Sequence, residues 1–141
     1  MRALLSFCQS FWRLYEAMGK RNPLWGPRER AFRLLVDNLS ATQREQFTRH
    51  GFFEVIGGKT GTTYRIREGH FLNVECLDAR GRCSRVLCFA PEGNLPVGDV
   101  LLAQKLALEL LEADALMVAN ALAPSSYMRA RYSGLADRLR G

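Results

Sequence analysis

Histidine and cysteine are scarce in this chain of 141 residues, which has two histidines and four cysteines. The cysteines stand at positions 8, 76, 83 and 88, so neither a Cys-x-x-Cys pair nor a paired-histidine motif is present. Structural zinc sites depend on ligands at such short spacings. We therefore expect no metal site, no cofactor, and free thiols in a reducing compartment.

Long uninterrupted hydrophobic runs are missing as well. Near the N-terminus, Arg2 is followed by a short apolar run that Ser6 interrupts before the core of a secretory signal could form. The most apolar stretch, residues 99–122, includes Lys105 and Glu109, and each such charge costs several kcal/mol inside a bilayer. The sequence therefore predicts a cytoplasmic protein with no membrane span.

Complete phosphate-binding and serine-enzyme motifs are also absent. The segment 57–63, with the sequence GGKTGTT, is similar to a phosphate-binding loop, but position 53 is not glycine and a strand is expected to follow. Its Lys59-Thr60-Gly61 matches an element of serine β-lactamases, yet no serine has a lysine three residues on. What remains is a glycine-rich turn whose amides, together with Lys59, can bind an anion.

Nucleophilic cysteine and paired-carboxylate chemistry have little support. A catalytic cysteine needs an accessible thiolate beside a histidine base. Cys83 is the one sheet thiol that we expect to be exposed, and a pair with His70 stays open as an alternative. Glu109 and Glu112 are expected to share a solvated helix strip with Lys105, where nothing desolvates one carboxyl. We predict no catalytic residue and a protein that is not an enzyme.

Hydrophobic spacing predicts helices in the first third of the chain. A helix over residues 2–18 is amphipathic, and a second is expected from Pro27 to Leu39. Ser40 and Gln43 form a capping box that begins a third helix, which ends before Gly51. The first helix carries an aromatic stripe that either packs in the core or docks on a partner, formed by Phe7, Phe11, Trp12 and Tyr15.

Between residues 52 and 90 the hydrophobic period changes to two, the period of a strand. Turns that contain glycine separate the apolar segments, as expected for an antiparallel meander. A helix with Asp99 as its N-cap and a Lys105–Glu109 ion pair is expected to cover the apolar face of the sheet. The predicted strands are 52–56, 62–67, 71–77 and 83–90, and the predicted helix is 99–122.

Loop lengths predict which side chains share a face of this sheet. A three-residue loop at 68–70 pairs Tyr64 with Val74, and a five-residue loop at 78–82 pairs Val74 with Val86. Both loops leave one face apolar and place charged residues on the other, namely Arg65, Arg67, Glu75 and Arg85. The residues expected on the buried face are Tyr64, Ile66, Leu72, Val74, Cys76, Val86, Cys88 and Ala90.

The chain is thus predicted to be an α+β protein in three parts. An N-terminal helical segment (1–39) precedes an α+β core (40–122), in which a long helix packs on a four-stranded antiparallel meander, and a basic tail (123–141) follows. The function that we expect first is a protein-binding adaptor or assembly subunit, which binds a protein partner or a second copy of itself. The long helix is a candidate docking element because it is apolar on almost every side.

Arginine supplies 17 of the 20 basic side chains, and the formal net charge is +6. Because exposed arginines suit phosphate groups, a nucleic-acid-binding module is the alternative function. Support for base stacking is small, since Phe71 is the single aromatic expected on the charged sheet face. A genome rich in arginine codons would explain the excess equally well. The candidate nucleic-acid contacts are Arg65, Arg67, Arg85, Arg129 and Arg131.

Four short segments carry a resemblance. GFFEV (51–55), YRIR (64–67), NVE (73–75) and LAQKLALE (102–109) together are similar to a group of short uncharacterised bacterial proteins, many from rhizobia and their relatives. The resemblance covers about residues 40–121 and implies a bacterial or phage origin. It implies no activity, ligand or site residue.

Overall fold

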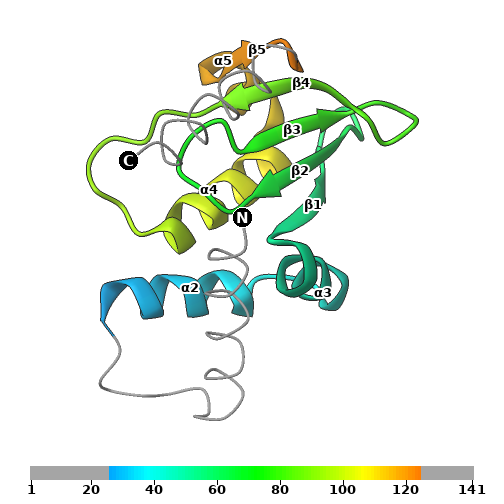
Figure 1. Ribbon diagram of the computed structural model, residues 1–141. Helices are drawn as coiled ribbons and strands as arrows, with labels where there is room; N and C mark the ends of the chain where they lie inside the picture. The colour runs from blue at the N-terminus through cyan, green and yellow to red at the C-terminus, as the bar shows by residue number, and fades with distance from the viewer. Residues whose placement is uncertain (1–25, 125–141) are drawn as a thin grey trace, which may run out of the picture.

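The computed structural model describes residues 26–124, which form an α+β fold with four helices and one five-stranded antiparallel sheet. The strands lie side by side in chain order, so the sheet is a meander. Figure 1 shows α4 lying across one face of the sheet, with α2 packed against α4 and α3 beside β1. The elements are α2 (Pro27–Asp37), α3 (Ala41–His50), β1 (Phe52–Ile56), β2 (Thr63–Arg67), β3 (Val74–Leu77), β4 (Cys83–Cys88), α4 (Val97–Leu110), α5 (Glu112–Val118) and β5 (Asn120–Leu122).

The α+β prediction is confirmed, but several of its finer details are wrong. The sheet has a fifth strand, β5, and the single helix expected over 99–122 is divided into α4 and α5 at Leu111. Leu111 has φ −133° and ψ 37°, outside the helical range, so the chain changes direction there. Asp99 lies in the first turn of α4 instead of at its N-cap, which is Pro96.

Local signals correctly placed α2 and α3. Pro27 starts α2, where its fixed φ suits the first turn. Ser40 and Gln43 form the predicted capping box, with hydrogen bonds of 3.0 and 3.2 Å. Gly51 ends α3 with φ 70°, a left-handed conformation that favours glycine.

Helix α3 also closes one edge of the sheet. Gln43 Nε2 donates to the carbonyl of Glu54 (2.8 Å), and the Glu54 N–H donates to Gln46 Oε1 (3.0 Å). These two side chains satisfy backbone groups of β1 that would otherwise face solvent at the edge. Strand addition at β1 is therefore blocked at Glu54.

The β2–β3 register differs from the prediction by two residues. Tyr64 pairs with Cys76 and Ile66 with Val74, because the connecting loop is longer than three residues. A shift of two keeps every side chain on its predicted face, so Tyr64 and Val74 are buried as expected. Leu72, expected in the core, lies in this loop with a positive φ of 50°. Phe71 lies in the same loop and is exposed.

The β3–β4 register differs by one residue, which does change the faces. The five-residue loop is as predicted, since Leu77 pairs with Cys83, but a β-bulge follows between Cys76 and Leu77. Beyond this bulge Val74 pairs with Leu87, so Leu87 enters the core beside it. Val86 is buried too, but opposite Glu75 on the other face of the sheet.

The core lies between the sheet, α4 and the two preceding helices. Gly98 allows α2 and α4 to approach closely, since a Cβ there would lie 2.5 Å from the backbone carbon of Ala31. The side chains of α2 and α3 share one apolar cluster with those of the sheet and α4. This cluster includes Phe32, Leu35, Phe47, Phe53, Val55, Tyr64, Ile66, Leu87, Leu101 and Leu108.

Candidate functional site

Several sequence-predicted site residues fall outside the part of the chain that the structure describes. These are the aromatic stripe and two arginines of the tail, that is Phe7, Phe11, Trp12, Tyr15, Arg129 and Arg131. None of the four helices in residues 26–124 combines the length and the apolar character that a bilayer span requires.

Arg65 and Arg67 lie on the sheet face opposite α4, as predicted, but both are engaged in ion pairs. Arg65 Nη2 is 2.8 Å from Glu54 Oε1, and Arg67 Nε is 2.6 Å from Glu75 Oε1. Both guanidinium groups also lie over the Phe52 ring, with their Cζ atoms 4.5 and 5.1 Å from its centroid. Two carboxylates thus neutralise the two arginines and occupy several of their donors.

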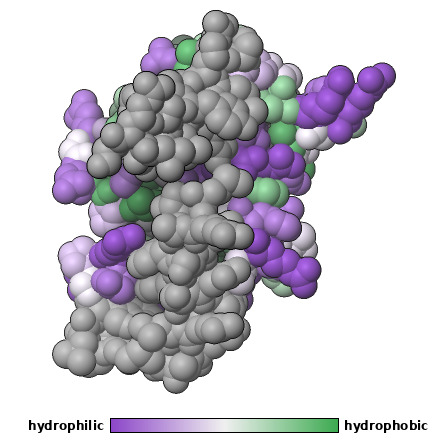
Figure 2. Space-filling view, viewed as in Figure 1, coloured by the Kyte–Doolittle hydropathy of each residue, from purple (hydrophilic) through white to green (hydrophobic). Residues whose placement is uncertain are grey.

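Arg85 does not join Arg65 and Arg67. The β-bulge pairs Arg85 with Cys76, a residue of the α4-facing side, so the prediction of three arginines on one sheet face is wrong. The most hydrophilic projection in Figure 2 is instead the turn between β3 and β4. Its exposed Arg82 is paired with Asp78, with 3.1 Å between Nη2 and Oδ2.

Within residues 26–124, neither histidine contacts a cysteine. His70 Nε2 lies 3.0 Å from the carbonyl oxygen of Leu95, and the His50 ring stacks on Phe52. The Cys83 thiol contacts the carbonyl of Arg85, and burial raises the pKa of this thiol. A raised pKa leaves less of the reactive thiolate at neutral pH.

The glycine-rich turn binds an anion that belongs to the chain itself. The Glu112 side chain enters it from the start of α5, and the N–H groups of Lys59 and Thr60 donate to Oε2 at 2.7 and 2.8 Å. The hydroxyl groups of Thr60 and Tyr64 donate to Oε1 at 2.5 and 2.7 Å. Glu112 is only 2% exposed, so its predicted place in a solvated strip is wrong. We call these donors and Glu112 the Glu112 cradle.

Lys105 Nζ lies 2.5 Å from Glu109 Oε2, which confirms the predicted ion pair along α4. Lys105 is itself buried, so its predicted place in a solvated strip is wrong as well. The turn that holds Glu112 is itself fixed to α4, because the Gly58 N–H donates to the carbonyl of Leu108 at 3.1 Å. The side chain of Lys59 is exposed, and binding of an external anion by Lys59 stays a prediction.

The cradle keeps Glu112 ionised. Desolvation alone would raise the pKa of Glu112, but the hydrogen bonds from Thr60, Tyr64 and the two backbone N–H groups outweigh it and lower the pKa to about 2. Burial and the bond to Glu112 raise the pKa of Tyr64, which stays protonated as a donor. A carboxylate with four donors is a structural anchor and is poorly suited to accept a proton in catalysis.

Stability is therefore expected to depend on pH through Glu112. Its pKa is depressed in the folded protein relative to the ordinary value of 4.5, so ionised Glu112 favours the folded state. This contribution is fully present above about pH 4.5 and is lost as the pH falls from there toward 2. Urea unfolding of the wild type and Glu112→Gln at several pH values would measure it. The two stabilities should converge at the acidic end, and a constant difference would contradict this account.

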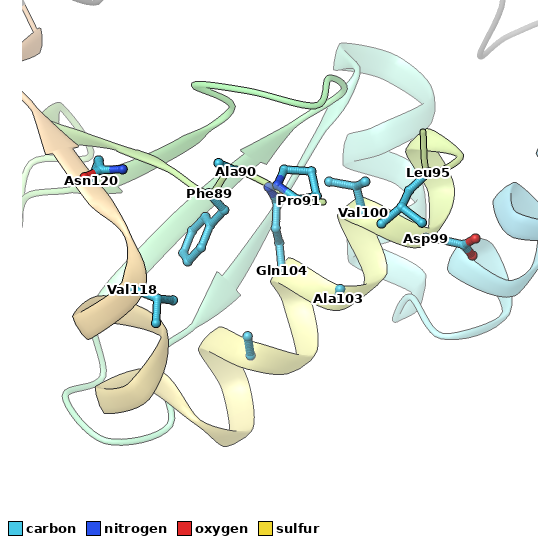
Figure 3. A pocket seen from close by; sticks show the side chains of 11 residues that line it. Phe89, Ala90, Pro91, Leu95, Asp99, Val100, Ala103, Gln104, Val118 and Asn120 are labelled. Atoms are coloured by element: carbon cyan, nitrogen blue, oxygen red, sulfur yellow. The ribbon is translucent and has the colours of Figure 1, made fainter. Parts of the chain in front are cut away.

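A groove of about 310 Å³ runs beside α4. It lies between one face of α4, the segment that follows β4, and the end of α5 with the start of β5. Figure 3 shows Phe89 and Val118 pointing into this space, with Ala103 on the adjoining helix. Most of the lining is apolar, and the lining residues are Phe89, Ala90, Pro91, Leu95, Asp99, Val100, Ala103, Gln104, Ala107, Val118 and Asn120.

Exposed apolar side chains are frequent in the segment of the chain that contains α4 and α5. Among the nine large hydrophobic residues that are exposed in the described part, five lie between residues 106 and 118. Val118, at 74% exposure, and Leu95, at 43%, line the groove directly. Exposed apolar side chains that line a groove are typical of an interaction surface. The five are Leu106, Leu110, Leu111, Met117 and Val118.

The polar groups of the groove are few. Gln104 is buried and exchanges two hydrogen bonds with Asn73, of 2.7 and 3.0 Å, so its amide is already engaged. Asp99 is the one charged residue among the described residues that line the groove. The sequence analysis did not single out this groove, because the division of α4 from α5 and the turn into β5 create it.

Among residues 26–124, no group of three or more histidine, cysteine or acidic side chains could hold a metal ion. No buried side-chain nitrogen or oxygen in that range lacks a hydrogen-bond partner. Comparison of the chain with protein-family models, with curated proteins and with solved structures found no match.

Proposed function

We propose that this protein is a non-enzymatic binding module, an adaptor or assembly subunit, that docks an apolar segment of a partner protein in the groove beside α4. The observation that carries this proposal is the groove itself, with its mostly apolar lining and the exposed side chains of Leu95 and Val118. A groove of this size can desolvate a few side chains of a partner, which is the usual source of binding energy at a protein interface.

The polar chemistry of the described residues supports a binding role over catalysis. Glu112, the one strongly shifted carboxylate, is anchored by four donors, and the groove contains no histidine or cysteine. Asp99, its single charged residue, lacks a neighbouring acid or base among the lining residues. A pair of groups with separated pKa values is what acid–base catalysis requires.

The nucleic-acid alternative has weaker support. Arg65 and Arg67 are neutralised by Glu54 and Glu75, and Arg85 lies on the other face of the sheet. A module that binds phosphates usually presents several unpaired cations on one surface. If this alternative holds, RNA or DNA will bind with an affinity that falls steeply with added salt.

Charge placed in the groove should abolish docking. Ala103 is exposed, so Ala103→Glu should fold normally and yet place an unpaired carboxylate in the groove. The probes are two labelled synthetic peptides of about four turns' length and equal leucine and lysine content, one patterned as a helix and one as a strand. The wild type should bind at least one of them, and Ala103→Glu should raise Kd at least about tenfold in fluorescence anisotropy.

Ala79→Glu is the matched control, since Ala79 is exposed in the turn between β3 and β4, away from the groove. This variant should bind like the wild type, and circular dichroism should show both variants folded. If neither peptide binds the wild type, or if Ala103→Glu binds as tightly as Ala79→Glu, the groove is not a docking site for apolar segments.

A further inference from the structure

We infer that the segment docked in this groove is an amphipathic α-helix of a partner protein, with basic residues along the flanks of its apolar face. The inference rests on the proposed function and adds the conformation and charge of the occupant. It follows from three features of the groove: the small residues on its floor, the closed or short edges of the sheet, and the charge around it.

The floor of the groove is one face of α4. Asp99, Val100, Ala103, Gln104 and Ala107 line it over about 12 Å of helix length. Ala103 and Ala107 are one turn apart and have only a methyl group each, so the axis of a second helix can come close. Gln104 adds no free polar group, because Asn73 engages its amide. The floor is thus a shallow apolar channel along a helix axis.

The walls of the channel stand on its two sides. Phe89 and Leu95 come from the segment that follows β4, and Val118 from the end of α5 (Figure 3). Apolar side chains spaced three and four residues apart on a partner helix would fit between these walls, as in other complexes where a helix lies in a groove.

An extended partner strand would find little backbone to pair with. Gln43 and Gln46 engage the backbone of Glu54 at the β1 edge. The other edge of the described sheet, β5, is three residues long (Asn120–Leu122), about 10 Å, which offers few hydrogen bonds to an added strand. A helix satisfies its own backbone hydrogen bonds and needs none from the groove.

Charge favours a basic partner. Residues 89–120, which include all lining residues, contain five acidic side chains and one basic one, in a chain whose net charge is +6. Lys105 pairs with Glu109, and Glu112 is buried in its cradle. Asp99 is the acidic residue among the described lining residues. Asp99 lies at one end of the channel floor, where a lysine or arginine one turn beyond the apolar face of the partner would reach it.

The two peptides described above separate a helical occupant from an extended one. The helix-patterned peptide should bind at least about tenfold more tightly than the strand-patterned one. Its far-ultraviolet circular dichroism should gain helix on binding. Ala103→Leu keeps the floor apolar but raises it. It should increase the Kd of the helix-patterned peptide about tenfold, because the two helix axes can no longer come close. Asp99→Asn should increase this Kd about threefold. Asp114 is exposed and lies outside the lining, so Asp114→Asn should leave the Kd unchanged.

Each other outcome has a defined meaning. If the strand-patterned peptide binds as tightly as the helical one and Ala103→Glu still abolishes binding, the helical occupant is wrong and the docking function stands. If the helix-patterned peptide binds Ala103→Leu more tightly than the wild type, the inference that two helices approach closely at Ala103 is wrong. If light scattering shows a dimer that Ala103→Glu dissociates, a second copy of the chain occupies the groove, which overturns the partner helix. Failure of both peptides overturns the docking function itself.

Discussion

Replacement of Glu112 by alanine is expected to lower the free energy of unfolding by roughly 3 kcal/mol, because it leaves buried donors of the cradle without an acceptor. Four donors converge on this carboxylate: the N–H groups of Lys59 and Thr60 and the hydroxyl groups of Thr60 and Tyr64. Urea unfolding at pH 7 measures the loss. The change also releases the start of α5 from the turn, so amide hydrogen exchange should accelerate in α5 and β5 before the rest of the sheet.

Two controls separate the cradle from a general effect of removing an acid. Glu112→Gln keeps the shape and can accept from the two N–H groups while donating to the two hydroxyls, so about half of the loss is expected. Asp114→Ala removes an exposed acid of the same helix turn and should cost no more than about 0.5 kcal/mol. Equal losses for Glu112→Ala and Asp114→Ala would show that the cradle contributes nothing particular to stability.

The parts of the fold that follow from local chemistry were predictable. Pro27, the Ser40–Gln43 capping box and Gly51 bound α2 and α3 through interactions within a few residues, and the structure has all three. The change of hydrophobic period after residue 51 identified β1 to β4. Such signals depend on neighbours in sequence, so one chain suffices to recognise them.

The face on which each sheet residue lies was predictable only where the predicted register is wrong by an even number of positions. For β2–β3, the predicted and observed registers differ by two positions, and both place Tyr64 and Val74 on the apolar face. For β3–β4, the β-bulge between Cys76 and Leu77 moves the pairing by one, so Leu87 replaces Val86 beside Val74 and Arg85 changes face. Val86 and Leu87 are both apolar, so the sequence pattern fits either register.

The candidate site was not predictable, because it depends on a break that has no local signal. Residues 99–122 are mostly apolar and favour helix, and they contain no proline or glycine that would end the helix near Leu111. The break is associated with Glu112, which is held by a turn about 50 residues earlier in the chain. Local helix propensity cannot anticipate this contact. The same break creates β5 and brings Val118 to the groove, so the missed feature is also the one on which the proposed function rests.

Replacement of Gly58 by alanine is expected to destabilise the protein by about 3 kcal/mol, a cost of overpacking against backbone that cannot move aside. A Cβ at position 58 would overlap the carbonyl oxygen of Glu109, at the end of α4. The turn would have to move away from α4 and break the bond from the Gly58 N–H to the Leu108 carbonyl. Gly93→Ala is the control: Gly93 has φ 81° and no atom lies within 4 Å of where its Cβ would be, so strain of the backbone dihedral alone should cost about 1 kcal/mol.

The losses of stability in Glu112→Ala and Gly58→Ala should not be independent. If Gly58→Ala moves the turn away from α4, the N–H groups of Lys59 and Thr60 move away from Glu112, so part of the cradle is lost already. The double variant with Glu112→Ala should then be more stable than the sum of the two single losses predicts, by about 1 kcal/mol or more. Urea unfolding of the four proteins in this cycle measures the coupling. Additive losses would mean that the contact of the turn with α4 and its hold on Glu112 are separate, and that Gly58 is needed for packing alone.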